Sequence, residues 1–197
     1  MTAETAPVAP RPAGARAKRE ILEAARALLE EVGPGGTTVE AIAKRAGVSK
    51  VTIYRWWPSR AAVIMSAFLQ LGRINAPYPE ELEPASTVDR LTLMAEAFCG
   101  PTGEMVKALV GEAQFDPEVA QAFRDGYVLA RRVEGKALIM HAIREGQIRE
   151  ADPAVVLDLI YAPLWYRLLV GHEPLDAAFV RAHVDLVWNG LAAGRPQ

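Results

Sequence analysis

The stretch TTVEAIAKRAGVSKVTIYRWWPSR, Thr37–Arg60, carries the signals of two short helices joined by a tight turn. Thr37 with Glu40 three residues later has the spacing of a capping box, which predicts the start of the first helix. Gly47 stands where a left-handed residue would end that helix, and Ser49 is a start signal for the next one. Two short helices separated by so few residues predict a helix-turn-helix.

The second of these helices has one inward and one outward face. Ile53 and Trp57, four residues apart, are predicted to point into the domain. The exposed first turn then carries Lys50, Val51, Thr52 and Tyr54. A recognition helix enters the major groove with this end, where an amine can donate to guanine, a methyl group can contact thymine and hydroxyls can reach phosphates. The stretch therefore predicts binding to duplex DNA.

The same stretch resembles the DNA-binding signature of the tetracycline-repressor (TetR) family, T-V-x-x-I-A-x-x-A-G-V-S-x-x-T-[IL]-Y-x-x-[FW]-x-[SN]-[KR]. The resemblance extends over about residues 15–72. It departs at Trp56, where the family often has His, Tyr or Phe, and at Pro58, where a polar residue is common. The resemblance implies DNA contacts, mostly with phosphates, at Thr37, Thr38, Lys50, Val51, Thr52, Tyr54, Trp56 and Arg60.

The rest of the chain predicts an all-α fold of about nine helices. Alternating runs of β-branched residues are absent, and prolines punctuate segments of helical periodicity. We expect body helices at about 87–99, 103–115, 117–146, 153–170 and 176–191. The expected organisation is a disordered arm (1–14), a helix-turn-helix domain (15–72), a linker (73–86), and a domain for ligand binding and dimerisation (87–197).

Charge is divided unevenly along the chain. Residues 1–73 hold eleven Lys and Arg against six Asp and Glu, whereas residues 74–197 hold eleven against eighteen. A basic head on an acidic body indicates that only the head meets a polyanion. Four basic residues lie near the N-terminal end, at Arg11, Arg16, Lys18 and Arg19. They are expected either to enter the minor groove of DNA or to form a solvated tail.

The last two predicted helices point to dimerisation. The segment 153–170 carries charge only at Asp158 and Arg167, so both of its faces need cover. The resemblance implies a four-helix interface about a two-fold axis, while the alternative is a monomeric core. The predicted interface residues are Val156, Ile160, Leu164, Leu168, Phe179, His183, Leu186 and Val187.

A small-molecule effector is implied by the resemblance alone. The body supplies candidate lining residues, although aromatic and Met side chains at helical spacing belong to a core more often than to a pocket. These candidates are Met94, Phe98, Met105, Phe115, Tyr127, His141, Tyr161 and Trp165. Their mostly apolar character favours a hydrophobic ligand.

Motifs of other protein classes are absent from the sequence. It contains no H-E-x-x-H, P-loop or G-x-S-x-G motif, so we predict neither an enzyme nor a cofactor or metal. Cys99 is the single cysteine, which excludes a disulfide within one chain. No signal-peptide pattern opens the sequence and no apolar run reaches about 18 residues, which predicts a cytoplasmic protein that does not cross a membrane.

These patterns predict a ligand-responsive transcription regulator, expected to repress, that binds a palindromic operator as a homodimer. Ligand would swing the helix expected at about 59–72 and change the spacing of the recognition helices. The alternative is a helical small-molecule sensor or interaction protein of the same fold that does not bind an operator.

Overall fold

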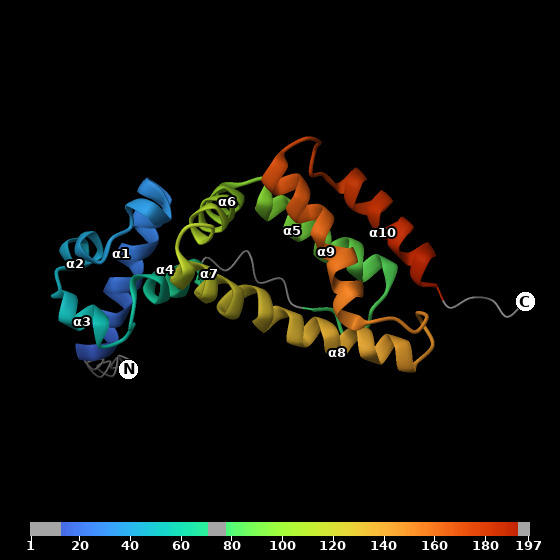
Figure 1. The fold of residues 1–197 in the computed structure, drawn as a ribbon, viewed down its shortest axis with the longest axis horizontal. Coiled ribbons are helices and arrows are strands. Elements are labelled where there is room, and N and C mark those ends of the chain that lie inside the picture. Colours follow the sequence, from blue (N-terminus) through green and yellow to red (C-terminus); the bar gives the residue numbers. More distant parts are fainter. Residues whose placement is uncertain (1–12, 71–77, 193–197) are drawn as a thin grey trace, which may run out of the picture. The chain divides into compact units, whose positions relative to one another are not determined.

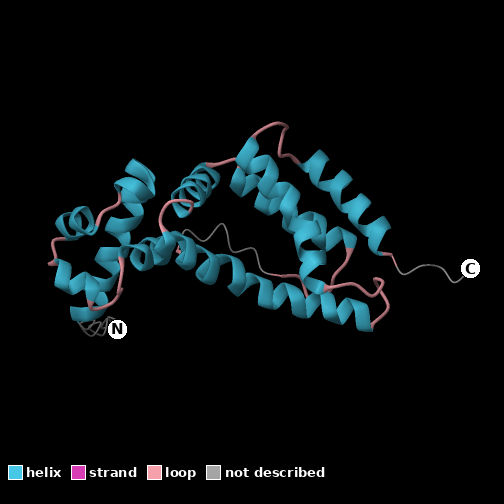
Figure 2. Ribbon diagram, in the orientation of Figure 1, coloured by secondary structure: helices cyan, strands magenta, loops and turns pink. Residues whose placement is uncertain are grey.

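The computed structural model describes residues 13–70 and 78–192, and these are helical almost throughout (Figure 1; Figure 2). Within them are ten α-helices, one π-helical segment and no strand beyond an isolated bridge between Ile148 and Ala192. The helices are α1 (Ala13–Gly36), α2 (Val39–Ala46), α3 (Lys50–Tyr54), α4 (Arg60–Leu69), α5 (Pro84–Phe98), α6 (Pro101–Ala113), α7 (Pro117–Phe123), η1 (Arg124–Leu129), α8 (Ala130–Arg144), α9 (Pro153–Val170) and α10 (Ala177–Leu191). Because α7, η1 and α8 follow one another without a break, the described part confirms the all-α prediction of about nine helical segments.

The chain divides into two compact units between Ala67 and Phe68, inside α4. Residues 1–12 of the predicted arm and residues 73–77 of the predicted linker lie outside the described residues. The predicted linker is already helical from Pro84 onward.

The first unit is built on the apolar faces of its helices. Ile21 of α1, Ile42 of α2 and Ile53 of α3 are completely buried and form the centre of its core. At Gly33, α1 bends, because this glycine has a left-handed φ of 70° that interrupts the helical backbone. One further helical turn follows the bend and ends at Gly36.

The second unit is a bundle in which α5, α8, α9 and α10 pack on one another. Four of its helices begin with proline, where the missing N–H costs no hydrogen bond: Pro84, Pro101, Pro117 and Pro153. Asp116 and Asp152 cap two of them by accepting from backbone N–H groups of the first turn. The predicted bounds of α9 agree with the structure to the residue.

The packing of the second unit shows that most of the predicted dimer interface was wrong. Val156, Ile160, Leu164, Leu168, His183 and Val187 are buried inside the subunit. For example, the ring Nε2 of His183 lies 3.0 Å from the carbonyl oxygen of Ile160. Since α9 is apolar on both faces, periodicity could not tell which face packs inward. Of the predicted set, Leu186 is exposed and Phe179 is half-buried.

A different stripe of α9 faces outward. Its exposed apolar residues are Val155, Leu159, Tyr166, Leu169 and Val170. By length and by a mean hydropathy of 1.4, α9 is the one described helix that could cross a membrane. A core helix of a soluble protein meets the same criterion, and the opposite face of α9 is packed inside this bundle.

Candidate DNA interface and effector cavity

The turn between α2 and α3 is held by side-chain caps and one glycine. Thr38, and not Thr37, caps α2, because its Oγ1 accepts from the N–H of Ala41 at 3.1 Å. Gly47 ends the helix with a φ of 66°, as predicted. Ser49 then caps α3 by accepting from the N–H of Thr52 at 3.2 Å. These caps fix the direction in which α3 leaves the turn.

The helix α3 presents the predicted face to solvent. Val51 is 78% exposed and Tyr54 is 50% exposed, whereas Ile53 between them is completely buried. Lys50 is exposed as well, and Thr52 is half-buried with its hydroxyl 2.9 Å from that of Ser49. A side chain as exposed as that of Val51 contributes little to the packing of this subunit.

The amine of Lys50 forms a surface ion pair in the free protein. Its Nζ lies 2.7 Å from the Oε1 of Glu40 on α2. Hydrogen bonding and charge attraction raise the pKa of Lys50 and lower that of Glu40. Both groups are fully ionised near neutral pH, and DNA phosphates would compete with Glu40 for this amine.

Two predicted contacts are occupied within the first unit. Thr37 is completely buried and its hydroxyl donates to the carbonyl of Gly33 at 2.7 Å, so its side chain is not a DNA contact. The sequence pattern missed this because Thr37 closes the bend of α1 and does not start α2. Arg60 is half-buried and donates from Nη1 to the carbonyl of Pro34 at 2.9 Å.

Trp56 lies beside the beginning of α1. Its ring is 42% exposed, and the Nζ of Lys18 lies 5.6 Å from the ring centroid. Arg16 and Arg19 belong to α1, where they pair with Glu20 and Glu23 one turn later. The predicted choice between a groove-binding arm and a free tail therefore does not apply to these three residues, and Arg11 lies outside the described part.

The second unit contains a cavity of about 740 Å³, counting the space at its open mouth. Residues from α5, η1, the beginning of α8 and α9 line it, together with Tyr78, which precedes α5. The lining is made of Tyr78, Arg90, Met94, Ala97, Phe98, Tyr127, Val128, Arg131, Arg132, Tyr161 and Trp165.

The aromatic part of this lining is a connected cluster. Trp165 meets Phe98 edge-on with ring centroids 5.3 Å apart, and its centroid is 6.2 Å from that of Tyr127. Tyr127 stands on η1, where an extra residue in the helical turn changes the direction of the side chains. Burial raises the pKa of Tyr127 to about 12 and raises that of Tyr161 as well, so both phenols are neutral near pH 7.

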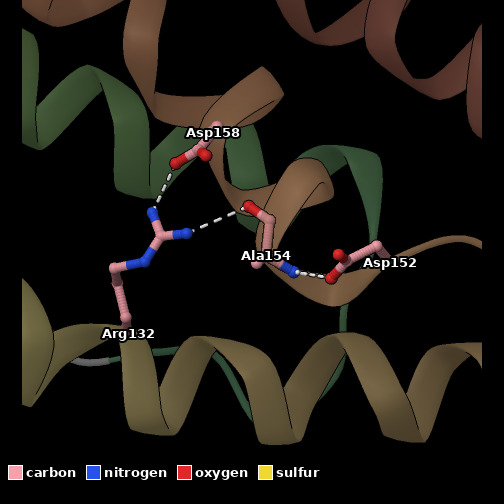
Figure 3. A network of polar contacts seen from close by, with 4 residues as sticks. All are labelled: Arg132, Asp152, Ala154 and Asp158. Atoms are coloured by element: carbon pink, nitrogen blue, oxygen red, sulfur yellow. Dashed lines mark hydrogen bonds and ion pairs between the residues drawn. The ribbon is translucent and has the colours of Figure 1, made fainter.

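Three guanidinium groups give the cavity its polar part. Arg90, only 9% exposed, donates from Nε to the hydroxyl of Tyr161 at 2.8 Å and stacks on the ring of Tyr78 at 3.7 Å. Arg131 lies 5.8 Å from the centroid of Tyr127. Figure 3 shows Arg132 reaching from α8 to α9, where it binds the Oδ1 of Asp158 and donates to a backbone carbonyl at 3.0 Å.

Comparison with known proteins identifies the family. Residues 21–66 match the model of bacterial regulatory proteins of the tetR family, and residues 88–187 match that of the tetracyclin repressor-like C-terminal domain. The HTH-type transcriptional regulator YdeS of Bacillus subtilis is 38% identical over 183 residues, which are 92% of this chain and 91% of that protein. The chain belongs to the TetR family.

Further relatives of this TetR-family protein agree with the assignment. The HTH-type regulator Rv1556 of Mycobacterium tuberculosis is 29% identical over 170 residues, which are 84% of this chain and 83% of that protein. The crystal structure of the TetR family transcription regulator SCO0332 has a TM-score of 0.74 and 32% identity, covering 90% of this chain and 99% of that one. As a family member, the protein is a ligand-responsive, DNA-binding transcription regulator.

The TetR-family cavity contains five of the residues named from sequence: Met94, Phe98, Tyr127, Tyr161 and Trp165. The other three lie outside it. Met105 is buried in α6 away from the lining, Phe115 is 91% exposed at the turn after α6, and His141 is half-buried near the end of α8. Helical spacing marked these residues as apolar or aromatic but gave no information about which helix faces meet.

The sequence patterns did not indicate the three arginines that line the cavity, which are Arg90, Arg131 and Arg132. Among the described residues, no cluster of His, Cys, Asp or Glu is suited to a metal ion.

Proposed function

We propose that this TetR-family protein is a homodimeric repressor that binds a palindromic operator and releases it when a small molecule occupies the cavity. The observation that carries the proposal is the solvent-facing first turn of α3, with Lys50, Val51 and Tyr54 exposed beside the buried Ile53. That turn has the residue types that read base edges and bind phosphates in the major groove. Two copies related by a two-fold axis would contact two half-sites about 34–36 Å apart, or a multiple of that.

The dimer is supported by the outward stripes of α9 and α10. On α9, Leu159 and Tyr166 stand on the exposed side, and on α10 Leu186 is 75% exposed. The two helices are in contact, and we propose that their outward stripes act together as one apolar surface. In a two-fold arrangement, this surface of one subunit packs against the same surface of a second subunit. The association then closes at a dimer, because no copy of the surface stays uncovered. The interface therefore consists of these outward residues and not of the buried set expected from sequence.

A route from the cavity to the DNA-binding unit runs through α4. Trp57, which follows α3, donates from Nε1 to the Oγ of Ser66 on this helix at 2.8 Å, and this bond ties α4 to the segment that leaves the recognition helix. At its other end, Phe68 lies edge-on to Tyr127 of the cavity, with ring centroids 5.7 Å apart. A ligand that moves Tyr127 would therefore move the end of α4, and its different affinity for the two arrangements would set the shift.

Relatives of this fold hold chemically unlike ligands. The regulator FadR of Bacillus subtilis was solved in complex with stearoyl-CoA, and a regulator from Saccharomonospora viridis was solved in complex with choline. The effector of this chain therefore has to be argued from its own cavity. We place the protein in the cytoplasm, where a chromosomal operator is accessible, and we propose no enzymatic activity.

The test is binding of the full chain to duplex DNA from the region upstream of its own gene. We expect a footprint with two-fold sequence symmetry, and a scrambled duplex of equal length should be bound only weakly. Equal and weak binding of both duplexes at low salt would contradict operator recognition and would favour a sensor of the same fold without an operator.

A further inference from the structure

We infer that the cavity takes a ligand with a flat, fused aromatic ring system, which packs against the indole ring of Trp165. This deepens the proposed function, on which it rests, by naming the class of effector and the residue that selects it. The hydrophobic ligand expected from sequence is thereby narrowed to an aromatic one.

The cavity is rich in aromatic side chains. Five of its eleven lining residues are aromatic, whereas aromatic residues make up 7% of the whole chain. These five are Tyr78, Phe98, Tyr127, Tyr161 and Trp165. They come from four separate segments, namely the residues before α5, α5 itself, η1 and α9. Because the folded bundle brings them together around one space, a ligand there meets aromatic surface from several elements.

Trp165 is the centre of this aromatic cluster. Its ring centroid lies 5.3 Å from that of Phe98 and 6.2 Å from those of Phe123 and Tyr127, and the ring planes are inclined by 71°, 84° and 64° in that order. Such steep, edge-on contacts are a favoured geometry of aromatic pairs, so three neighbours hold the indole in one orientation. A ligand that packs on a side chain already held in place loses little affinity to the cost of ordering it.

Trp165 also keeps surface that its neighbours do not cover. Phe98, Phe123 and Tyr127 are buried, whereas Trp165 is half-buried and lines the cavity. Offset or edge-on ring contacts stabilise an aromatic pair beyond the burial of apolar area. A saturated ligand of the same skeleton gains only the burial of its area, and its puckered rings cannot lie as close to a ring face. Trp165 should therefore favour flat ligands over saturated ones.

Two alcohols with the same carbon skeleton separate flatness from apolar surface. 2-Naphthol is flat and aromatic, and decahydro-2-naphthol is its fully saturated, puckered counterpart. Both are uncharged at pH 7, so the comparison does not depend on the guanidinium groups of the lining. We would titrate the full-length protein with each alcohol by calorimetry, and then the variants W165L, W165F, W188L and A97W. The control W188L removes a half-buried tryptophan of α10 that does not line the cavity, and A97W, which fills the cavity, locates the site.

We expect 2-naphthol to bind about three- to tenfold more tightly than its saturated counterpart, as aromatic ring contacts imply. W165L should remove most of that preference and leave the affinity for the saturated alcohol within about twofold. W165F keeps a ring at this position and should retain part of the preference, and W188L should retain all of it. A97W should weaken the binding of both alcohols, with helical content by circular dichroism unchanged.

Equal affinity for the two alcohols, or no binding of 2-naphthol up to its solubility limit, would overturn the inference. So would a preference that survives unchanged in W165L, because Trp165 would then not select the ligand. Tight binding of 2-naphthol that survives in A97W would overturn it as well, since the ring would then lie elsewhere. None of these titrations contains DNA, so their failure is distinct from a failure of operator binding. Conversely, a protein that binds 2-naphthol through Trp165 but binds no operator would keep this inference and lose the proposed function.

Discussion

The dimer interface that we propose makes a quantitative prediction about Leu186. This residue is 75% exposed in the subunit, so most of its side chain is available for burial by a partner copy. Complete burial of a leucine is worth about 1.5–3 kcal/mol, and three quarters of it about 1–2 kcal/mol. A two-fold interface contains the residue twice, so L186A should weaken the dimer by about 2–4 kcal/mol.

The measurement is the dimer dissociation constant from sedimentation over a wide concentration range. A loss of about 2–4 kcal/mol corresponds to a dissociation constant raised about 30- to 1,000-fold. V133A is the matched control, because Val133 on α8 is 71% exposed and lies on neither α9 nor α10. An unchanged dissociation constant in L186A, or an equal loss in V133A, would refute the assignment of this face.

Three further predictions concern local features of the structure. T37V should destabilise the protein by about 1 kcal/mol in urea, because the part-buried carbonyl of Gly33 loses a donor. T37S should stay close to the wild type, and neither variant should alter operator sequence preference. Between pH 10 and 12, Tyr127 ionises in the unfolded chain but stays protonated in the folded protein, where its pKa is raised to about 12. The free energy of unfolding should therefore fall by about 3 kcal/mol through this residue as the pH rises from 10 to 12. Y127F should lack this contribution to the loss. G135A should be destabilised, because the added methyl carbon would lie 2.7 Å from the Oη of Tyr78; an unchanged melting temperature would show that Tyr78 moves aside without cost.

Local signals in the sequence predicted the helix-turn-helix well. Gly47 and Ser49 determine backbone geometry within a few residues of themselves, and the structure confirms both roles. The error at Thr37 has the same local origin, because two adjacent threonines offered two positions for one cap, and the bend at Gly33 decided between them.

The body was predicted less completely, for a physical reason. The ends of α9 follow from Pro153 and Gly171, which act locally. Contacts with α5, α8 and α10 decide which side of α9 packs inward. The sequence of a helix that is apolar on both faces does not indicate this side. The cavity depends on more distant partners still, since Arg90 and Tyr161 are 71 residues apart in the chain and hydrogen-bond only in the folded bundle.

The proposal that the exposed first turn of α3 binds the operator is tested most directly by changing that turn. We would measure operator affinity by fluorescence anisotropy for the wild type, the double variant V51A/Y54A and the control L93A, whose exposed leucine lies on α5. All three proteins should melt at nearly the same temperature, because the substituted side chains are at least half exposed. If Val51 and Tyr54 contact the operator, V51A/Y54A should lose about tenfold or more in operator affinity and L93A should lose none. Wild-type affinity in a folded V51A/Y54A would contradict it.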